Sequence, residues 1–226
     1  MNLGVQFFMQ IINLHTHRSI IGNHIQLLNV FAQDLPLMSS EQFYSAGLHP
    51  WHIGKVNPEA CFQAIEVAAK QKNMLAVGEC GLDRAIETAY EIQELYFIKQ
   101  IDIAVKYTKP LIIHGVRAYS DLLKLKKATR TDIPWILHGF NGNRETTLNL
   151  IRNGFYFSFG EALLKNEMKH ELFRAIPMDR IFFETDNLEI PIQQIYFIAS
   201  QLLGFEEEDL AESIFSNFKT VFGDVI

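Results

Sequence analysis

The sequence has few of the features that would set it apart from ordinary globular proteins. It contains two cysteines among 226 residues, Cys61 and Cys80, and they do not form a CxxC pair. Two cysteines cannot supply a disulfide framework for a chain of this length, so we expect both thiols to be reduced. No stretch offers the roughly 18 uninterrupted apolar residues of a membrane span. The apolar N-terminus has no basic residues before it and no small-residue cleavage site, so we expect a cytoplasmic protein that does not enter a membrane.

Positive charge is also scarce. The chain has 20 lysines and arginines against 26 acidic residues, a net charge of −6. A protein that coats duplex nucleic acid needs clustered cationic surface, and this composition excludes one. A site that holds a single phosphate end remains compatible with it. Nothing in the sequence points to an obligate protein partner.

No linker, low-complexity tract or short repeat divides the chain, which predicts a single domain over residues 1–226. What recurs is an alternation of short apolar runs with longer stretches at helical spacing, the pattern of βα units. The runs expected to be strands are Ile11–His17, Ile25–Ala32, Tyr44–His49, Met74–Glu79, Leu111–His114, Trp135–His138, Phe155–Phe159 and Ile181–Asp186.

Helical patterns fall between most of these strands. They cover Pro58–Lys72, Thr88–Tyr107, Ala118–Ala128, Arg144–Asn153, Asn166–Ala175, Pro191–Leu203 and Glu207–Phe222. Eight strands alternating with helices predict an α/β protein with a (β/α)8 TIM barrel. The stretch Arg18–Ser45 has no convincing helix, so a barrel trimmed near the N-terminus is one alternative, and an open sheet of six to eight strands is another.

Polar residues close several of the apolar runs. In a parallel barrel the carboxyl ends of the strands form the active-site mouth, so these side chains are predicted to meet there. His15 and His17 lie two positions apart on one strand and therefore point to the same side. The full set is His15, His17, Glu79, His114, His138 and Asp186.

Each of these residues alone is more often a hydrogen-bonded barrel residue or a helix cap. Together they are four imidazoles and two carboxylates, and burying the carboxylates without a cation would cost several kcal/mol each. The set exceeds the need of one tetrahedral ion but suits two divalent cations such as Mg²⁺, Mn²⁺ or Zn²⁺. We predict that Glu79 bridges them, with His15, His17 and Asp186 on the first ion and His114 and His138 on the second.

A water between two such ions loses a proton easily, which predicts hydrolysis. Glu79 and Asp186 are the predicted catalytic residues, since Asp186 could orient this water or accept its proton.

The strings around these residues resemble the TatD family of metal-dependent deoxyribonucleases, from about Ile11 to Phe222. The resemblance is carried by Asn13-Leu14-His15-Thr16-His17, Ala46-Gly47-Leu48-His49-Pro50-Trp51, Val77-Gly78-Glu79-Cys80-Gly81-Leu82-Asp83, Ile113-His114, His138-Gly139-Phe140-Asn141-Gly142 and Glu184-Thr185-Asp186. It implies a metal-dependent barrel that hydrolyses DNA, as a 3′ to 5′ exonuclease where activity is assigned, with Mg²⁺. It also implies that the six residues occupy the family's metal positions and that His49 lies near the substrate.

The chain departs from the family pattern in four places. Asn13 stands where the family usually has Asp, Arg117 is displaced by one position, Asn187 replaces a proline, and the segment from His17 to His49 is short. These departures keep open a hydrolase of a different small ester or amide on the same binuclear site. A non-catalytic metal-binding or scaffold protein is a third hypothesis. It predicts that some ligands would be missing, whereas all six are present in the sequence.

Four arginines fall just after the ligand motifs and could hold phosphate through paired hydrogen bonds. They are Arg18, Arg84, Arg117 and Arg144. Together with His49, we predict that Arg117 and Arg144 contact the substrate, DNA ends or single-stranded DNA. Trp51, Phe140 and Phe159 could stack an unpaired base.

Overall fold

The computed structural model describes residues 10–225, except 21, 23, 38–41 and 166–167. Eight strands form one sheet in chain order, and each pairs in parallel with the next. They are β1 (Ile11–Thr16), β2 (His24–Phe31), β3 (Tyr44–Gly47), β4 (Met74–Asp83), β5 (Leu111–Val116), β6 (Trp135–Leu137), β7 (Phe155–Phe159) and β8 (Ile181–Phe183).

The ring closes between the last residue of β1 and a residue just beyond the end of β8. Thr16 and Asp186 form an isolated parallel bridge. The Asp186 amide donates to the His15 carbonyl at 2.9 Å, and the His17 amide donates to the Asp186 carbonyl at 3.0 Å. The predicted (β/α)8 barrel is confirmed, and the open-sheet alternative is wrong.

Most strands are apolar because the barrel interior covers one face and helices cover the other. Every residue of β1, β4 and β7 is buried, as expected for parallel strands inside a barrel. Two glycines let β4 lie close against β5. A Cβ at Gly78 would come within 2.3 Å of the Ile112 carbonyl oxygen, and one at Gly81 within 2.1 Å of the His114 carbonyl oxygen.

Several predicted strand ends need correction. β4 continues past Glu79 to Asp83, and β5 continues past His114 to Val116. Other predicted strands were too long, since β1 ends before His17, β3 before His49, β6 before His138 and β8 before Asp186. There the backbone leaves the ladder to enter the mouth, and Asp186 takes a φ of 50°. β2 begins and ends one residue earlier than predicted.

The helices are α1 (Pro58–Ala68), α2 (Tyr90–Lys106), α3 (Tyr119–Thr129), α4 (Arg144–Arg152), α5 (Glu161–Lys165), α6 (Met168–Arg174), α7 (Ile192–Leu203) and α8 (Glu207–Phe222). Side-chain caps begin two of them, since Asn57 accepts from the Ala60 amide at 3.2 Å and Asn143 from the Thr146 amide at 2.9 Å. α1 ends at Ala68, before the predicted Lys72, and α5 was not predicted. The predicted start at Asn166 lies outside the described residues.

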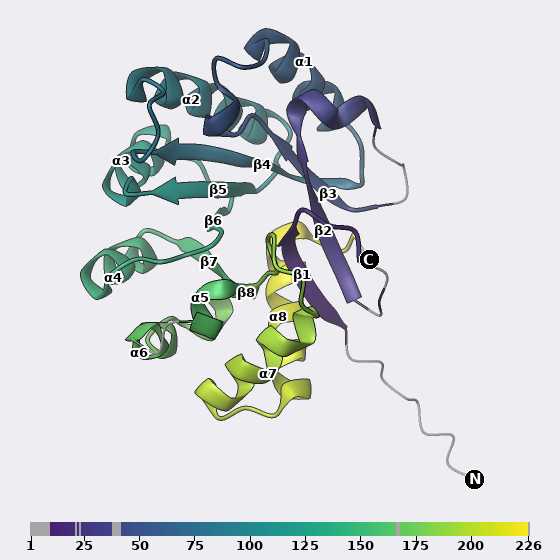
Figure 1. Ribbon diagram of the computed structural model, residues 1–226, viewed down its shortest axis with the longest axis vertical. Helices are drawn as coiled ribbons and strands as arrows, with labels where there is room; N and C mark the ends of the chain where they lie inside the picture. Colours follow the sequence, from purple (N-terminus) through teal and green to yellow (C-terminus); the bar gives the residue numbers. More distant parts are fainter. Residues whose placement is uncertain (1–9, 21, 23, 38–41, 166–167, 226) are drawn as a thin grey trace.

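The wall of the barrel is uneven. Among the described residues no α-helix links β1 to β2, and only the 3-10 helix η1 (Ala32–Leu37) lies between β2 and β3. Figure 1 shows α-helices around β4 to β8, whereas η1 is the helix drawn at the end of β2. The predicted lack of helix near the N-terminus is therefore confirmed, although all eight strands are present. None of the described helices has the length and apolar character needed to cross a membrane.

Candidate metal centre

The Glu79 carboxylate lies at the centre of the mouth and is 4% exposed. β4 carries it there, and each of its oxygens faces a different group of imidazoles. Oε2 faces His15 of β1 and His17 just after it. Oε1 faces His114 of β5 and the two histidines that follow β3 and β6, His49 and His138.

On the Oε2 side, the atoms lie slightly farther apart than hydrogen-bond partners. The His15 Nε2 atom is 3.5 Å from Glu79 Oε2 and 3.6 Å from Asp186 Oδ1. The His17 Nε2 atom is 3.6 Å and 3.3 Å from the same two oxygens. Atoms that share a tetrahedral ion at about 2.1 Å lie about 3.4 Å apart, so this spacing suits a ligand set.

His15 supports the same conclusion. Its side chain is fully buried, and neither of its ring nitrogens has a hydrogen-bond partner. Buried polar atoms without partners are rare in native proteins. A cation beside His15 Nε2 would satisfy that nitrogen, so the residues present fit a metal ion.

On the Oε1 side, three imidazoles approach at hydrogen-bond distance. Glu79 Oε1 lies 2.8 Å from His138 Nε2, 2.9 Å from His114 Nδ1 and 3.0 Å from His49 Nε2. The structure thus brings all six sequence-predicted ligands to one place and adds His49. His49, Glu79 and His114 form one group whose atoms could hold an ion.

Around these residues lies a second layer of polar groups that orients them. The Glu79 amide donates to Asn29 Oδ1 at 2.8 Å, and Asn29 Nδ2 lies 3.4 Å from Glu79 Oε2. Glu184 Oε1 accepts from the Gly139 amide at 2.7 Å and lies 3.5 Å from His138 Nδ1.

Asp83 lies beside His114 as Glu184 lies beside His138. Its Oδ2 lies 3.0 Å from His114 Nε2, which leaves Nδ1 of the same ring to face Glu79. The Trp51 indole also donates to Asp83 Oδ2, at 2.8 Å. Partners of this kind set the tautomer and orientation of a metal-binding histidine.

The charges of the cluster shift the pKa values of its members. Burial alone would raise the pKa of Glu79, but positive charge on His138 and hydrogen bonds from the surrounding imidazoles hold it well below its ordinary range. Burial would lower the pKa of His17, yet the adjacent carboxylates of Asp186 and Glu79 raise it to about 9. Imidazolium protons therefore balance the carboxylates, and a cation would have to displace them.

A cleft of about 530 Å³ opens beside these groups. His114, His138, Glu184 and Asp186 line it, and Lys165 on α5 is the cationic residue at its edge. Lys165 pairs with Glu161 on the same helix. The volume lies within the usual range of small-molecule sites.

The predicted arginines lie elsewhere. Arg117 is exposed and is not among the residues that line the cleft, and Arg144 borders a separate hollow between α4 and α6. Arg18 pairs with Glu189, and Arg84 pairs with Asp121 at 2.7 Å. The structure therefore does not gather these arginines at the ligands, and contact of Arg117 and Arg144 with substrate stays a prediction.

Of the three aromatic residues predicted to stack a base, only Trp51 is exposed. Phe140 and Phe159 are 1% and 2% exposed, so the prediction that they stack a base is wrong. The Phe140 ring packs against Phe157 with centroids 4.7 Å apart. Trp51 is 53% exposed and remains available.

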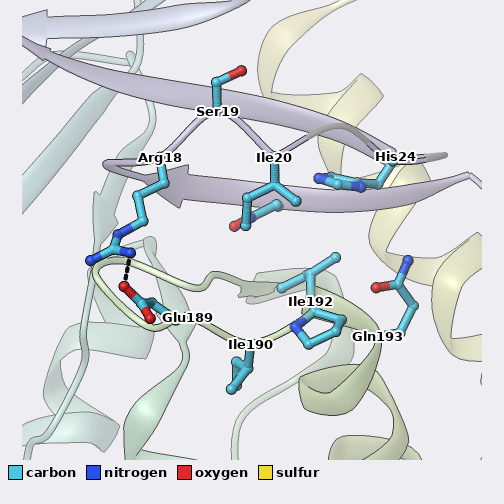
Figure 2. Close-up of a pocket in the computed structure, with 11 residues that line it drawn as sticks. Arg18, Ser19, Ile20, His24, Glu189, Ile190, Ile192 and Gln193 are labelled. Atoms are coloured by element: carbon cyan, nitrogen blue, oxygen red, sulfur yellow. Dashed lines mark hydrogen bonds and ion pairs between the residues drawn. The ribbon is translucent and has the colours of Figure 1, made fainter.

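A second cavity, of about 660 Å³, lies between the segment that connects β1 to β2 and the start of α7 (Figure 2). The Arg18–Glu189 ion pair closes one end, and His24 and Gln193 lie toward the other. Asn13 also lines this cavity. Its side chain donates to Thr185 Oγ1 at 2.8 Å and accepts from the Thr185 amide at 3.0 Å, which holds the segment before Asp186 against β1.

Sequence reasoning missed Asn29, Asp83, Glu184 and Lys165. Asn29 could have been noticed as an amide inside an apolar run, and Asp83 and Glu184 already stood in the quoted motifs without a role. Lys165 carried no signal, because its helix was not predicted.

The eight-stranded barrel and the imidazole and carboxylate cluster at its mouth define a barrel protein built to hold metal ions. Residues 26–223 match the family described as TatD related DNase, and the chain belongs to that family. The matched region begins after His15 and His17, which lie in and just after β1.

Similar proteins agree with this assignment. A Buchnera aphidicola protein named as an uncharacterized metal-dependent hydrolase is 31% identical over 205 residues, 80% of this chain and 76% of that protein. A Klebsiella pneumoniae protein named 3′-5′ ssDNA/RNA exonuclease TatD is 32% identical over 148 residues, 63% and 56% of the two chains. The crystal structure of the TatD homologue YJJV from Escherichia coli K12 superposes with a TM-score of 0.82 at 17% identity, covering 94% and 97%. The family, the relatives and the ligand cluster together make this chain a metal-dependent hydrolase.

Proposed function

We propose that the protein is a deoxyribonuclease that hydrolyses DNA phosphodiester bonds at DNA ends or in single strands, using two divalent cations. The position of Glu79 is the observation that carries this proposal, because its two oxygens face two separate groups of imidazoles. A carboxylate between two ligand groups is the arrangement of binuclear hydrolases. The Klebsiella relative named as an exonuclease supports DNA as the substrate.

In this proposal the ligands divide between the two oxygens of Glu79. His15, His17 and Asp186 with Oε2 would hold one ion, and His114, His138 and His49 with Oε1 would hold the other. When bound, Mg²⁺, Mn²⁺ or Zn²⁺ at such a site supplies an ionised water and offsets charge on the phosphoryl oxygens.

The chain's own residues have distinct tasks in the reaction. Asp186 is the carboxylate of the cluster that borders the cleft, and its side chain is 40% exposed. Its Oδ1 faces His15 and His17, so we assign to Oδ2 the orientation of the attacking water and the acceptance of its proton. Lys165 at the edge of the cleft can bind a phosphate oxygen, since a lysine acts toward phosphate as a point charge.

The test is release of nucleotides from labelled single-stranded DNA by metal-free protein to which Mg²⁺, Mn²⁺ or Zn²⁺ is added back. We expect cleavage that depends on metal and falls at least about a hundredfold in Glu79→Gln and Asp186→Asn. Glu212→Gln, an exposed acidic position on α8, is the matched control and should retain activity. Protein that binds metal but releases no nucleotide would contradict the nuclease proposal.

The lining of the cleft favours a second candidate, a hydrolase of a different small ester or amide. Among the residues that line it, Lys165 is the lysine or arginine, whereas Glu161, Glu184 and Asp186 are acidic. A nucleic acid chain usually meets more positive charge than this. Turnover of a neutral ester or amide, but of no phosphodiester, would favour this candidate.

A further inference from the structure

We propose that Trp51 forms a stacking subsite for an unpaired nucleobase beside the metal centre. The proposal rests on the proposed function, because it concerns a single-stranded nucleic acid substrate. Nothing in the assignment of the metal ligands requires an aromatic residue at this position.

Trp51 is exposed and yet held in place. It lies in the 3-10 helix η2 (Pro50–His52), directly after β3, and is 53% exposed. Its indole nitrogen donates to Asp83, a carboxylate that is 2% exposed, and its amide donates to His49 Nδ1 at 3.1 Å. A side chain already fixed in one orientation loses little conformational entropy when a ligand binds to it.

The indole also lies against the ligand cluster. Its ring centroid is 4.9 Å from that of His49 and 5.7 Å from that of His114. Both of these imidazoles contact the Oε1 atom of Glu79. A base on the indole would therefore lie next to the place where the scissile phosphate must bind.

Other large apolar side chains on the described surface have no such position. The exposed ones besides Trp51 are Val67, Ile92, Leu95, Val105, Phe197 and Phe205. They lie on α1, α2 and α7 or directly after α7. Trp51 is the member of the exposed group that contacts histidines of the cluster.

The chemistry of the indole suits an unpaired base. Every nucleobase offers a π face, so stacking on an aromatic ring tolerates any sequence. In a duplex that face is covered by the neighbouring base pair, and exposing it costs the energy of unstacking. The subsite therefore selects single strands and frayed ends without reading their sequence.

A fluorescence measurement tests contact with the base directly. The chain has two tryptophans, and the other, Trp135, is fully buried. Titration of the Mg²⁺-loaded protein with a short phosphorothioate-linked dT oligomer should quench the emission of Trp51. An abasic oligomer of the same length should quench much less, and Trp51→Phe, which retains only Trp135, should remove the response. Equal quenching by both oligomers would overturn the proposal.

Kinetics separate stacking from an effect through Asp83. Trp51→Ala should raise KM about tenfold for cleavage of a dT oligomer and change KM little for the abasic oligomer, while Trp51→Phe should keep most of the affinity. Phe197→Ala, which removes a ring exposed to 51% on α7, is the matched control and should leave both substrates unchanged.

Two outcomes would overturn the stacking subsite. One is an unchanged KM for dT in Trp51→Ala, and the other is an equal loss on both oligomers, which would make Trp51 a positioning residue for His114. Cleavage of both oligomers without dependence on Trp51 would refute only this subsite. Failure of the wild-type protein to cleave either oligomer would refute the nuclease proposal itself.

Discussion

The two parts of the barrel wall differ sharply. From β4 to β8, the thick part, α-helices connect the strands. Among the described residues no α-helix connects β1 to β2 or β2 to β3, and we call β1 to β3 with the loops after them the thin part. Yet the thin part supplies His15, His17, Asn29 and His49, and the thick part supplies Glu79 and its remaining partners. The register of neighbouring strands, and not the helical wall, is what positions the ligands.

Loss of Glu79 should have the largest effect, because this residue joins the two parts. Glu79→Ala leaves the imidazoles of both sides without their shared carboxylate. We expect both ions to be lost, and hydrolysis to fall on the order of a thousandfold or more. Metal content and turnover measured together will check this. Retention of one ion would show that one part of the barrel can bind metal alone.

Metal binding should stabilise the thin part most. A ligand at about 100 times its Kd adds about 2.7 kcal/mol to the free energy of unfolding. Because no α-helix among the described residues connects β1 to β2 or β2 to β3, we expect the gain in amide hydrogen-exchange protection to be greatest in β2 and in the ends of these connections. The measurement is exchange of metal-free and metal-loaded protein, strand by strand. A gain confined to β4 to β8 would contradict this view.

The outer polar groups allow a matched comparison of the two parts. Asn29 supports Glu79 from β2, and Asp83 supports His114 from β4. Asn29→Ala and Asp83→Asn should each weaken metal binding about 10- to 100-fold, as measured by calorimetric titration. If only Asp83→Asn has an effect, the contribution of the thin part is smaller than its contacts indicate.

The stability of the metal-free protein should depend on pH through His17. Its pKa is raised from 6.5 to about 9. The contribution of protonated His17 to the free energy of unfolding is therefore fully present below about pH 6.5 and is lost as the pH rises through about 9. The Tm of the metal-free protein should fall across this window. The metal-loaded protein should lack this fall, because its His17 is already deprotonated. Thermal unfolding of His17→Asn provides the control, and an unchanged pH dependence there would assign the effect to another group.

The smallest effect is expected at the cavity in the thin wall. Arg18 and Glu189 are 50% and 74% exposed, and exposed ion pairs contribute at most about 1 kcal/mol. Arg18→Ala should lower the free energy of unfolding by less than this and leave metal affinity unchanged. Denaturant unfolding and metal titration will check both values. A large loss of metal affinity would mean that the wall itself holds the ligands.

The barrel and the convergence of the six candidate ligands at its mouth were predictable because they depend on patterns within single strands. Apolar runs indicate buried strands, and the period of two places His15 and His17 on one side. Asn29 was not predictable in this way, since its role comes from its contact with Glu79, 50 residues away. Such contacts depend on register between strands, which the pattern within one strand does not contain.

Loops limited the prediction of substrate contacts. Arg117 and Arg144 follow ligand motifs, but the direction of a side chain in a loop depends on local backbone conformation. Arg117 has a φ of 52° and is exposed. The resemblance gave His49 a role near the substrate, whereas the structure places it 3.0 Å from Glu79 Oε1.

The closure of the ring beside Asp186 has a consequence for synthesis of the protein. Thr16 and Asp186 are 170 positions apart in the chain, and domains emerge from the ribosome N-terminus first. His15 and His17 therefore leave the ribosome long before the carboxylate that completes their group. A nascent chain that ends before Asp186 cannot close the barrel or assemble its full ligand set. We therefore expect tight metal binding only in a nearly finished translation product.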